Sequence, residues 1–135
     1  MWLLRSAEIS KTAPIMCLLG VVYSRLKEKD RALQAWQEAI KLDARCEEAY
    51  YNLGILALDK GNMDQAEDFF RKSLHIDPGF LRAHAHLGRL MLKQGRRLEA
   101  DNEFRRCIEI DPNDRAANLY FGAGGPGLNK GSKPS

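Results

Sequence analysis

The sequence predicts an all-α fold built from repeated pairs of antiparallel helices. Four glycines, Gly20, Gly54, Gly88 and Gly122, are each 34 residues apart, and three blocks of sequence repeat with that period. Within each block, apolar residues recur at helical spacing in two segments that a short polar turn separates. No segment shows the strict alternation of apolar and polar residues that is typical of a strand. Each block is therefore predicted to be one helix-turn-helix unit.

The first helix of each block contains the repeated glycine. These helices are predicted over Met16–Tyr23, Tyr50–Leu58 and His84–Leu92. Glycine inside a helix costs roughly 1 kcal/mol relative to alanine, so its repetition at one position indicates that a side chain would not fit there. His84 stands where the other blocks have Met16 and Tyr50, so we expect it to be a packing residue.

The second helix of each block is amphipathic and carries a small residue followed four positions later by an aromatic residue. These helices are predicted over Arg31–Leu42, Met63–Ile76 and Arg97–Ile110. The repeated positions are Ala32, Ala66 and Ala100, and then Trp36, Phe70 and Phe104. Pro78 and Pro112 close the second and third blocks, because proline cannot continue a helix. We expect the small residues to bring the two backbones of a pair together, with the aromatic ring filling the space beside them.

The two ends of the chain depart from the period. Trp2–Ile9 fits weakly to the second helix of a preceding unit, and we expect residues 1–12 to be a ragged N-terminal segment. Residues 115–122 begin a fourth first helix, whose final glycine is in register. Glycine and proline predict a disordered tail over 123–135. The repeat domain is expected over 13–122. The chain is expected to be a piece or a shortened variant of a longer array, the alternative being a complete small protein.

Composition and charge exclude several classes of function. The net charge of +3 arises from 21 basic and 18 acidic side chains, which is too mild to favour a nucleic-acid partner. No apolar run approaches the roughly 20 residues that a membrane span requires, so we expect no membrane insertion. The N-terminus lacks the basic start and the long apolar run of a secretory signal. A cytoplasmic location is therefore expected, with the nucleus or another intracellular compartment as alternatives.

The cysteines and histidines form no recognisable chemical motif. Cys17, Cys46 and Cys107 are far apart in the sequence and include no CxxC pair. We expect them to be buried or half-buried thiols rather than a metal or redox site. His84 and His86 are two residues apart on a predicted helix and so point to different faces. The chain is therefore expected to need no cofactor, to bind no metal and to have no catalytic activity of its own.

A helix-turn-helix unit of 34 residues resembles the tetratricopeptide repeat family. The residues at its signature positions are Met16, Leu19, Gly20, Tyr23, Ala32 and Trp36 in the first block, Tyr50, Leu53, Gly54, Ala66, Phe70 and Pro78 in the second, and His84, Leu87, Gly88, Ala100, Phe104 and Pro112 in the third. Only the first block lacks the proline, where Ala44 stands instead. The resemblance gives three repeats, at 13–46, 47–80 and 81–114. It implies a right-handed α-solenoid whose first helices line a concave groove that binds a peptide or a helix of another protein.

Alignment of the three blocks with the pattern of the family implies which residues line the groove. They are the residues of each first helix that do not face the second helix of the same repeat. These are Pro14, Cys17, Leu18, Val21 and Arg25, then Glu48, Tyr51, Asn52, Ile55 and Asp59, then Arg82, Ala85, His86, Arg89 and Lys93. The groove changes from apolar through mixed to basic, which would complement an apolar segment followed by acidic residues. Asn52 is suited to hold a peptide backbone, because an amide both donates and accepts. The alternative is a solvated helix residue.

The predicted function is a scaffold or adaptor for another protein. Chaperone-binding members of the family hold a C-terminal carboxylate in a clamp of lysine, asparagine and arginine. Here Cys17, Val21 and His86 stand where lysine, asparagine and arginine are expected, so binding of a chaperone tail is not expected. The alternatives are a regulatory or substrate-docking segment of a larger enzyme, such as a glycosyltransferase, and a truncated isoform with little independent function. The identity of the partner and the oligomeric state stay open.

Overall fold

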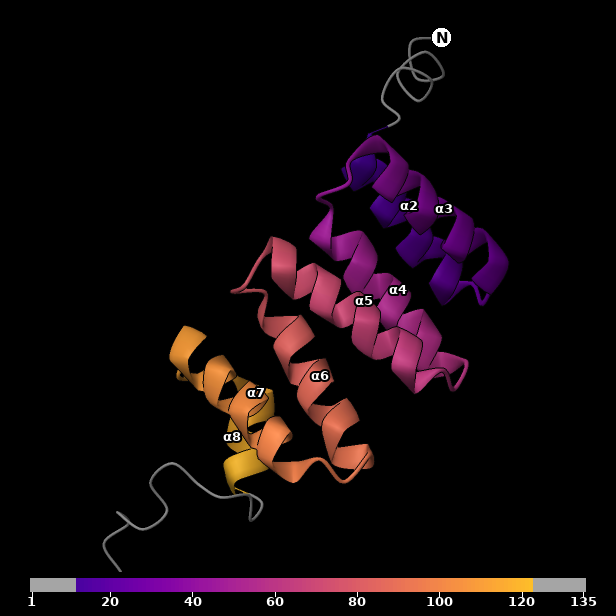
Figure 1. Ribbon diagram of the computed structural model, residues 1–135. Coiled ribbons are helices and arrows are strands. Elements are labelled where there is room, and N and C mark those ends of the chain that lie inside the picture. The colour runs from indigo at the N-terminus through magenta and orange to yellow at the C-terminus, as the bar shows by residue number, and fades with distance from the viewer. Residues whose placement is uncertain (1–11, 123–135) are drawn as a thin grey trace, which may run out of the picture. The chain divides into compact units, whose positions relative to one another are not determined.

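The computed structural model describes residues 12–122, which form seven helices and no strand (Figure 1). The helices are α2 (Ala13–Arg25), α3 (Lys29–Leu42), α4 (Glu47–Asp59), α5 (Met63–Ile76), α6 (Leu81–Lys93), α7 (Arg97–Ile110) and α8 (Arg115–Gly122). The all-α class and the helix pairs predicted from the period are thus confirmed. The expectations for the ragged N-terminal segment before residue 12 and for the tail over 123–135 lie outside the described residues.

The chain divides into two compact units, with the boundary between Pro78 and Gly79. In unit 1, α2 packs against α3, α4 packs against α5, and α3 also contacts α4. In unit 2, α6 packs against α7, and α8 packs against α7. None of the helices described between residues 12 and 122 combines the length and the apolar character that crossing a bilayer requires.

The turn inside each helix pair has the same backbone conformation. One residue in each turn has a positive φ, of 65° at Lys27, 83° at Gly61 and 78° at Gly95. The next amide then bonds back to a carbonyl five residues earlier, for example from the nitrogen of Asn62 to the oxygen of Ala57 at 2.8 Å. This is the Schellman ending of a helix, in which the left-handed position favours glycine. The first repeat is the exception, because it places a lysine at that position.

Pro78 and Pro112 lie between helices, as the sequence predicts. Helix α5 ends at Ile76 and α6 begins at Leu81, so Pro78 lies in the connection between them. Helix α7 ends at Ile110, and Pro112 follows it before α8 begins. Proline has no N–H to donate to the ladder of helical hydrogen bonds, so each of these prolines prevents the preceding helix from extending through the connection.

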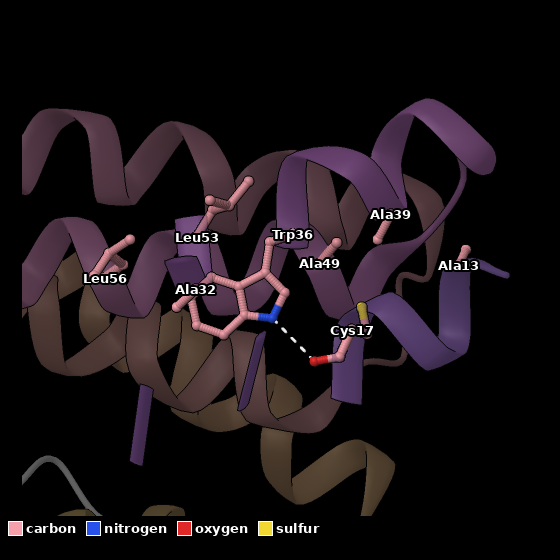
Figure 2. Packing of buried hydrophobic residues seen from close by; sticks show 8 residues of the cluster. All are labelled: Ala13, Cys17, Ala32, Trp36, Ala39, Ala49, Leu53 and Leu56. Atoms are coloured by element: carbon pink, nitrogen blue, oxygen red, sulfur yellow. Dashed lines mark hydrogen bonds between the residues drawn. The ribbon is translucent and has the colours of Figure 1, made fainter. Parts of the chain in front are cut away.

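A cluster of buried apolar side chains holds unit 1 together (Figure 2). Its members are Ala13, Cys17, Ala32, Trp36, Ala39, Ala49, Leu53 and Leu56. Trp36 lies at the centre, and its indole nitrogen donates a hydrogen bond of 3.2 Å to the backbone carbonyl oxygen of Cys17. A buried indole N–H needs such an acceptor, because an unpaired donor inside the protein is costly. This bond connects α3 to α2 within the first repeat.

The repeated glycine makes room for the repeated aromatic ring. The pairs are Gly20 with Trp36, Gly54 with Phe70, and Gly88 with Phe104. A Cβ atom built on Gly54 would lie 2.7 Å from Cε1 of Phe70, and one on Gly88 would lie 2.8 Å from Cε2 of Phe104. The sequence predicts a close approach of the two backbones at this point. In the structure the ring itself fills the space that the missing side chain leaves.

One face of α2 exposes apolar side chains to solvent. They are Ile15, Leu18, Leu19 and Val22, and Leu26, which directly follows the helix, is exposed as well. The equivalent face of α4, one period later, carries Ala49, Leu53 and Leu56, which are buried in the cluster with residues of α3. This face is therefore less completely covered on α2, the first helix of the first repeat, than on α4, the first helix of the second repeat.

Unit 2 has a small core in which α7 packs against both of its neighbours. Phe104 and Cys107 of α7 are buried, and the ring of Phe104 stacks on Tyr120 of α8 with 4.3 Å between the ring centroids. His84 of α6 is also buried, and its Nδ1 lies 2.8 Å from Oε1 of Glu103. The sequence predicts a packing role for His84. The structure adds a hydrogen-bond partner, the carboxylate of Glu103.

Candidate functional site

A pocket of about 410 Å³ lies in unit 1, where α2, the turn after α3 and the start of α4 meet. We call it the unit 1 pocket. Its lining residues are Ala13, Pro14, Cys17, Leu18, Val21, Asp43, Arg45, Cys46, Glu47, Glu48 and Asn52. Six of the residues that the sequence assigns to the groove therefore come together here, namely Pro14, Cys17, Leu18, Val21, Glu48 and Asn52.

The unit 1 pocket combines an apolar wall with an acidic edge. Leu18 and Val21 supply the wall from α2, and Leu18 is 66% exposed. Three carboxylates line the pocket, from Asp43, Glu47 and Glu48, against the single guanidinium of Arg45. An excess of negative charge beside an apolar wall favours a ligand that is apolar and basic. The sequence predicts a mixed character for this region and does not predict the acidic excess.

Local structure explains why the carboxylates gather at this edge. Glu47 and Glu48 occupy the first turn of α4, where a negative charge is favourable beside the unpaired amides of the helix. Asp43 follows the last residue of α3, and its Oδ1 accepts a hydrogen bond of 3.0 Å from the backbone nitrogen of Arg45. Asn52 stands one turn further along α4 and is half-buried. Its amide can donate and accept toward a ligand backbone.

Tyr51 and Ile55 do not line the unit 1 pocket. Tyr51 is only 7% exposed, and its ring lies 5.9 Å from that of Phe70 on α5. It therefore contacts the second helix of its own repeat, which corrects its assignment as a residue that faces away from that helix. Ile55 is half-buried. The sequence assigned Tyr51, Asn52 and Ile55 to one broad face of the helix, although the neighbours Tyr51 and Asn52 differ by about 100° in direction.

A second pocket of about 410 Å³ lies in unit 2, among α6, α7 and α8. We call it the unit 2 pocket. It is lined by Arg89, Leu92, Arg97, Phe104, Ala116, Leu119 and Tyr120. Two guanidinium groups therefore accompany an apolar and aromatic surface, without an acidic residue among the lining side chains. Burial raises the pKa of the Tyr120 hydroxyl above its usual value, so this side chain stays neutral.

The remaining basic positions of α6 lie outside the unit 2 pocket. The guanidinium carbon of Arg82 is 5.1 Å from the centre of the Phe80 ring, and Lys93 is exposed in the last turn of the helix. Nδ1 of His86 lies 3.1 Å from the carbonyl oxygen of Arg82, to which it donates when protonated. Burial lowers the pKa of His86 below its usual value of 6.5. The expected basic end therefore gains no charge from His86 near neutral pH.

The residues that sequence reasoning missed come mainly from turns. Asp43, Arg45 and Glu47 surround the connection between α3 and α4, and Arg97 begins α7. Helical periodicity selects faces of helices and gives no direction for side chains between them. The available signal was the alternation of charged residues in the connection, next to a helix start that attracts carboxylates. Among residues 12–122, no three potential metal-ligating side chains converge.

Comparison with known families identifies the repeat. Two tetratricopeptide repeat models match the sequence, one over residues 17–79 and the other over residues 57–120. The chain belongs to the tetratricopeptide repeat family. The resemblance stated from the spacing of glycines, alanines and aromatic residues is thereby confirmed, and so is the α-solenoid fold class. A comparison with curated protein sequences gave no match.

Solved structures of tetratricopeptide repeat proteins are similar to this chain. A crystal structure of MamA is 32% identical, with a TM-score of 0.70, and the match covers 76% of this chain and 60% of that one. The chain thus spans about three fifths of that relative. The repeat domain of Arabidopsis OM64 is 25% identical, with a TM-score of 0.73, and the match covers 79% and 88% of the two chains. The first repeat domain of Spaghetti (RPAP3), bound to the HSP90 peptide SRMEEVD, is 16% identical with a TM-score of 0.75, covering 82% and 88%. That last likeness shows the fold alone.

Proposed function

We propose that this tetratricopeptide repeat chain is a protein-interaction module that binds a peptide or a helix of another protein at the unit 1 pocket. The observation that carries the proposal is the convergence of six groove positions, on α2 and α4, around one cavity. Family membership supports protein–protein interaction as the class of function. The structure of the Spaghetti repeat domain with a bound peptide supports a peptide as the kind of ligand.

The chemistry of the unit 1 pocket supports a ligand that is apolar and basic. A volume of about 410 Å³ beside Leu18 and Val21 accommodates a large apolar side chain and its neighbours. Full burial of one such side chain contributes about 2 kcal/mol. The carboxylates of Asp43, Glu47 and Glu48 favour a lysine or an arginine close to it. The preferred segment at unit 1 is therefore apolar and basic, and the predicted order of apolar followed by acidic residues does not describe this pocket.

The acidic part of the predicted ligand fits unit 2 instead. Arg89 and Arg97 line the unit 2 pocket together with Leu92, Leu119 and the ring of Tyr120. A carboxylate between two guanidinium groups gains charge-assisted hydrogen bonds, and the apolar surface favours an adjacent aromatic or aliphatic side chain. We treat the two pockets as separate binding surfaces of opposite charge.

Binding rather than catalysis accounts for the lining residues. The unit 1 pocket presents carboxylates, an arginine, an amide and the thiols of Cys17 and Cys46, and no histidine or serine is among its lining residues. The buried pair of His84 and Glu103 lies in unit 2, where neither residue lines the unit 2 pocket. A general base must lie within hydrogen-bond reach of the group that it deprotonates. We therefore propose a scaffold, with no reaction of its own.

Selection from a random peptide library tests the proposal. The full chain is immobilised, and peptides are selected against it and against Leu18→Asp, Glu48→Lys and Arg89→Glu variants. We expect the wild-type chain to enrich two sets of peptides, one apolar and basic and the other apolar and acidic. Leu18→Asp and Glu48→Lys should abolish the first set and leave the second. Arg89→Glu should do the reverse.

The matched control is Leu98→Asp. Leu98 is 82% exposed on α7 and lines neither described pocket, so this variant makes the same chemical change at an unrelated site. A selected apolar and basic peptide should bind Leu98→Asp as tightly as wild type and bind Leu18→Asp about tenfold more weakly, which corresponds to 1.4 kcal/mol. Equal loss of binding in both leucine variants, or enrichment that no variant changes, would refute the assignment of the pocket.

A further inference from the structure

Two of the three cysteines lie together in unit 1, although 29 residues separate them along the chain. The Sγ atoms of Cys17 and Cys46 are 3.4 Å apart. Cys17 is buried on α2, and Cys46 is half-buried at the residue that precedes α4. Both side chains line the unit 1 pocket. Cys107, by contrast, is fully buried in unit 2.

The geometry of this pair is close to that of a disulfide bond. A disulfide places its two sulfur atoms about 2.05 Å apart, so the Sγ atoms need to approach each other by about 1.4 Å. Cys46 lies in the connection between α3 and α4 as the N-cap of α4, with φ of −87° and ψ of 89°, and its carbonyl oxygen accepts a hydrogen bond of 3.1 Å from the amide of Ala49. Rotation of its half-buried side chain can supply the movement of the sulfur. The amide nitrogen of Cys46 is held in that connection by a hydrogen bond of 3.1 Å to the carbonyl oxygen of Asp43.

We infer that Cys17 and Cys46 form a modification site, a dithiol that low-molecular-weight disulfides oxidise to an intramolecular disulfide bond. The thiolate of Cys46 attacks one sulfur of the small disulfide, forms a mixed disulfide and releases the first thiol. The sulfur of Cys17 then attacks Sγ of Cys46, the mixed disulfide breaks and the second thiol leaves. The two protons of the cysteines pass to the two released thiols, so two thiols are oxidised and one disulfide is reduced. This site does not depend on the proposed binding of peptides.

Exposure sets the order of the two steps. Cys46 is the more accessible of the two side chains and reaches the small disulfide first. Burial raises the pKa of the Cys17 thiol well above its ordinary value, so Cys17 is a poor nucleophile toward reagents in solution. Once Cys46 carries the mixed disulfide, its sulfur lies next to Cys17, and proximity compensates for the low thiolate fraction. Cys17 is thus the resolving residue.

The bond would join α2 to the start of α4 and enclose the whole of α3. Crosslinking a loop of this length reduces the entropy of the unfolded chain. We expect the melting temperature of unit 1 to rise on the order of 10 °C in the oxidised form. Because both sulfur atoms line the unit 1 pocket, the oxidation also changes the shape of its wall.

The test uses the full chain in buffers of oxidised and reduced glutathione, followed by alkylation of free thiols and tryptic mapping. Trypsin separates the relevant peptides, 12–25 with Cys17, 46–60 with Cys46 and 107–115 with Cys107. We expect peptides 12–25 and 46–60 to appear linked, while 107–115 is fully alkylated after unfolding. The Cys107→Ser variant, which keeps the pair, should give the same link. The Cys46→Ser variant should leave Cys17 as a free thiol.

Unfolded protein provides the second control. In guanidinium chloride all three cysteines are accessible, so mixed pairings that include Cys107 should appear, and the selective link should be lost. The inference is overturned if Cys17 and Cys46 both stay as thiols in the folded chain under conditions that oxidise dithiothreitol. It is also overturned if each carries a glutathione without forming the link, or if the folded chain gives the same mixture of pairings as the unfolded one.

Discussion

Replacement of Gly54 by alanine tests the pairing of glycine with the aromatic ring. The new Cβ would lie 2.7 Å from Cε1 and 2.9 Å from Cδ1 of Phe70, whose side chain is fully buried. Carbon atoms in good contact are about 3.5–4.0 Å apart, so the ring or the helix must move by about 0.8 Å. Overpacking of this kind costs about 1–3 kcal/mol. Alanine recovers about 1 kcal/mol of helix propensity, so we expect a net destabilisation of about 1 kcal/mol.

The partner of the clash is identified by a double-mutant cycle. Phe70→Leu removes Cε1 and Cζ and leaves a more flexible side chain, so in that background Gly54→Ala should stabilise the chain by about 1 kcal/mol. The coupling energy between the two positions is then about 2 kcal/mol. The matched control is Phe104→Leu, which truncates the equivalent ring of unit 2 and should be additive with Gly54→Ala. Urea unfolding followed by far-UV circular dichroism measures all five variants against wild type.

The absence of coupling between Gly54 and the ring of Phe70 would refute the proposed role of the glycine. If Gly54→Ala is as stable as wild type, and its effect is the same with and without the Phe70 ring, the glycine is not there to accommodate the ring. A coupling to Phe104→Leu as large as that to Phe70→Leu would also contradict it, because it would indicate a general loss of packing.

Three further predictions concern a turn, a buried hydroxyl and a histidine. Lys27→Gly should stabilise unit 1 by roughly 1 kcal/mol in a thermal melt, because it puts glycine at a left-handed backbone position, as in the other two repeats. An unchanged melting temperature would show that the lysine is not strained at this position. Ser73→Ala should cost about 1 kcal/mol in urea unfolding, because Oγ donates a hydrogen bond of 3.0 Å to the carbonyl oxygen of Glu47; no loss would contradict its contribution. His86 should titrate below 6.5 by NMR, since burial disfavours its charged form. At His86 the unfolded chain then binds a proton more readily than the folded chain. The contribution of His86 to the free energy of unfolding is therefore present above pH 6.5 and is lost as the pH falls below 6.5. A pKa of His86 at or above 6.5 in the folded chain would refute this.

Periodicity was sufficient to predict the helices and their pairing. The 34-residue spacing placed Gly54 on a first helix and Phe70 on its second helix, and the structure brings the two into contact. It also selected Leu18 and Asn52, which line the same pocket. These positions follow from helix geometry and register within unit 1, where α3 of the first repeat contacts α4 of the second. Tyr51 shows where register is too coarse, since it lies one residue from Asn52 and faces the second helix of its own repeat.

Connections between helices are the part that the period could not predict. Cys17 and Cys46 both fall within the first repeat, 13–46, but one lies on a helix and the other in a connection, so no column of the repeat relates them. Their contact depends on the path of the chain from Asp43 to the start of α4. The acidic edge of the unit 1 pocket also depends on the path of this connection, because its carboxylates lie in the connection or in the first turn of α4. The division of the chain after Pro78 likewise reflects the packing of whole helices rather than any single residue.

The exposed apolar face of α2 has a consequence for local opening of the chain. In a stack of repeats, each helix pair is stabilised by its own contacts and by those with its neighbours. Helix α4 buries Ala49, Leu53 and Leu56 against α3, whereas α2 leaves Ile15 and Val22 in solvent. The amides of α2 should therefore exchange with deuterium ahead of those of α4. Since α2 forms one wall of the unit 1 pocket, a ligand bound there would slow amide exchange in α2 most. Ligand binding would then be linked to the equilibrium between the folded and the locally opened state of α2.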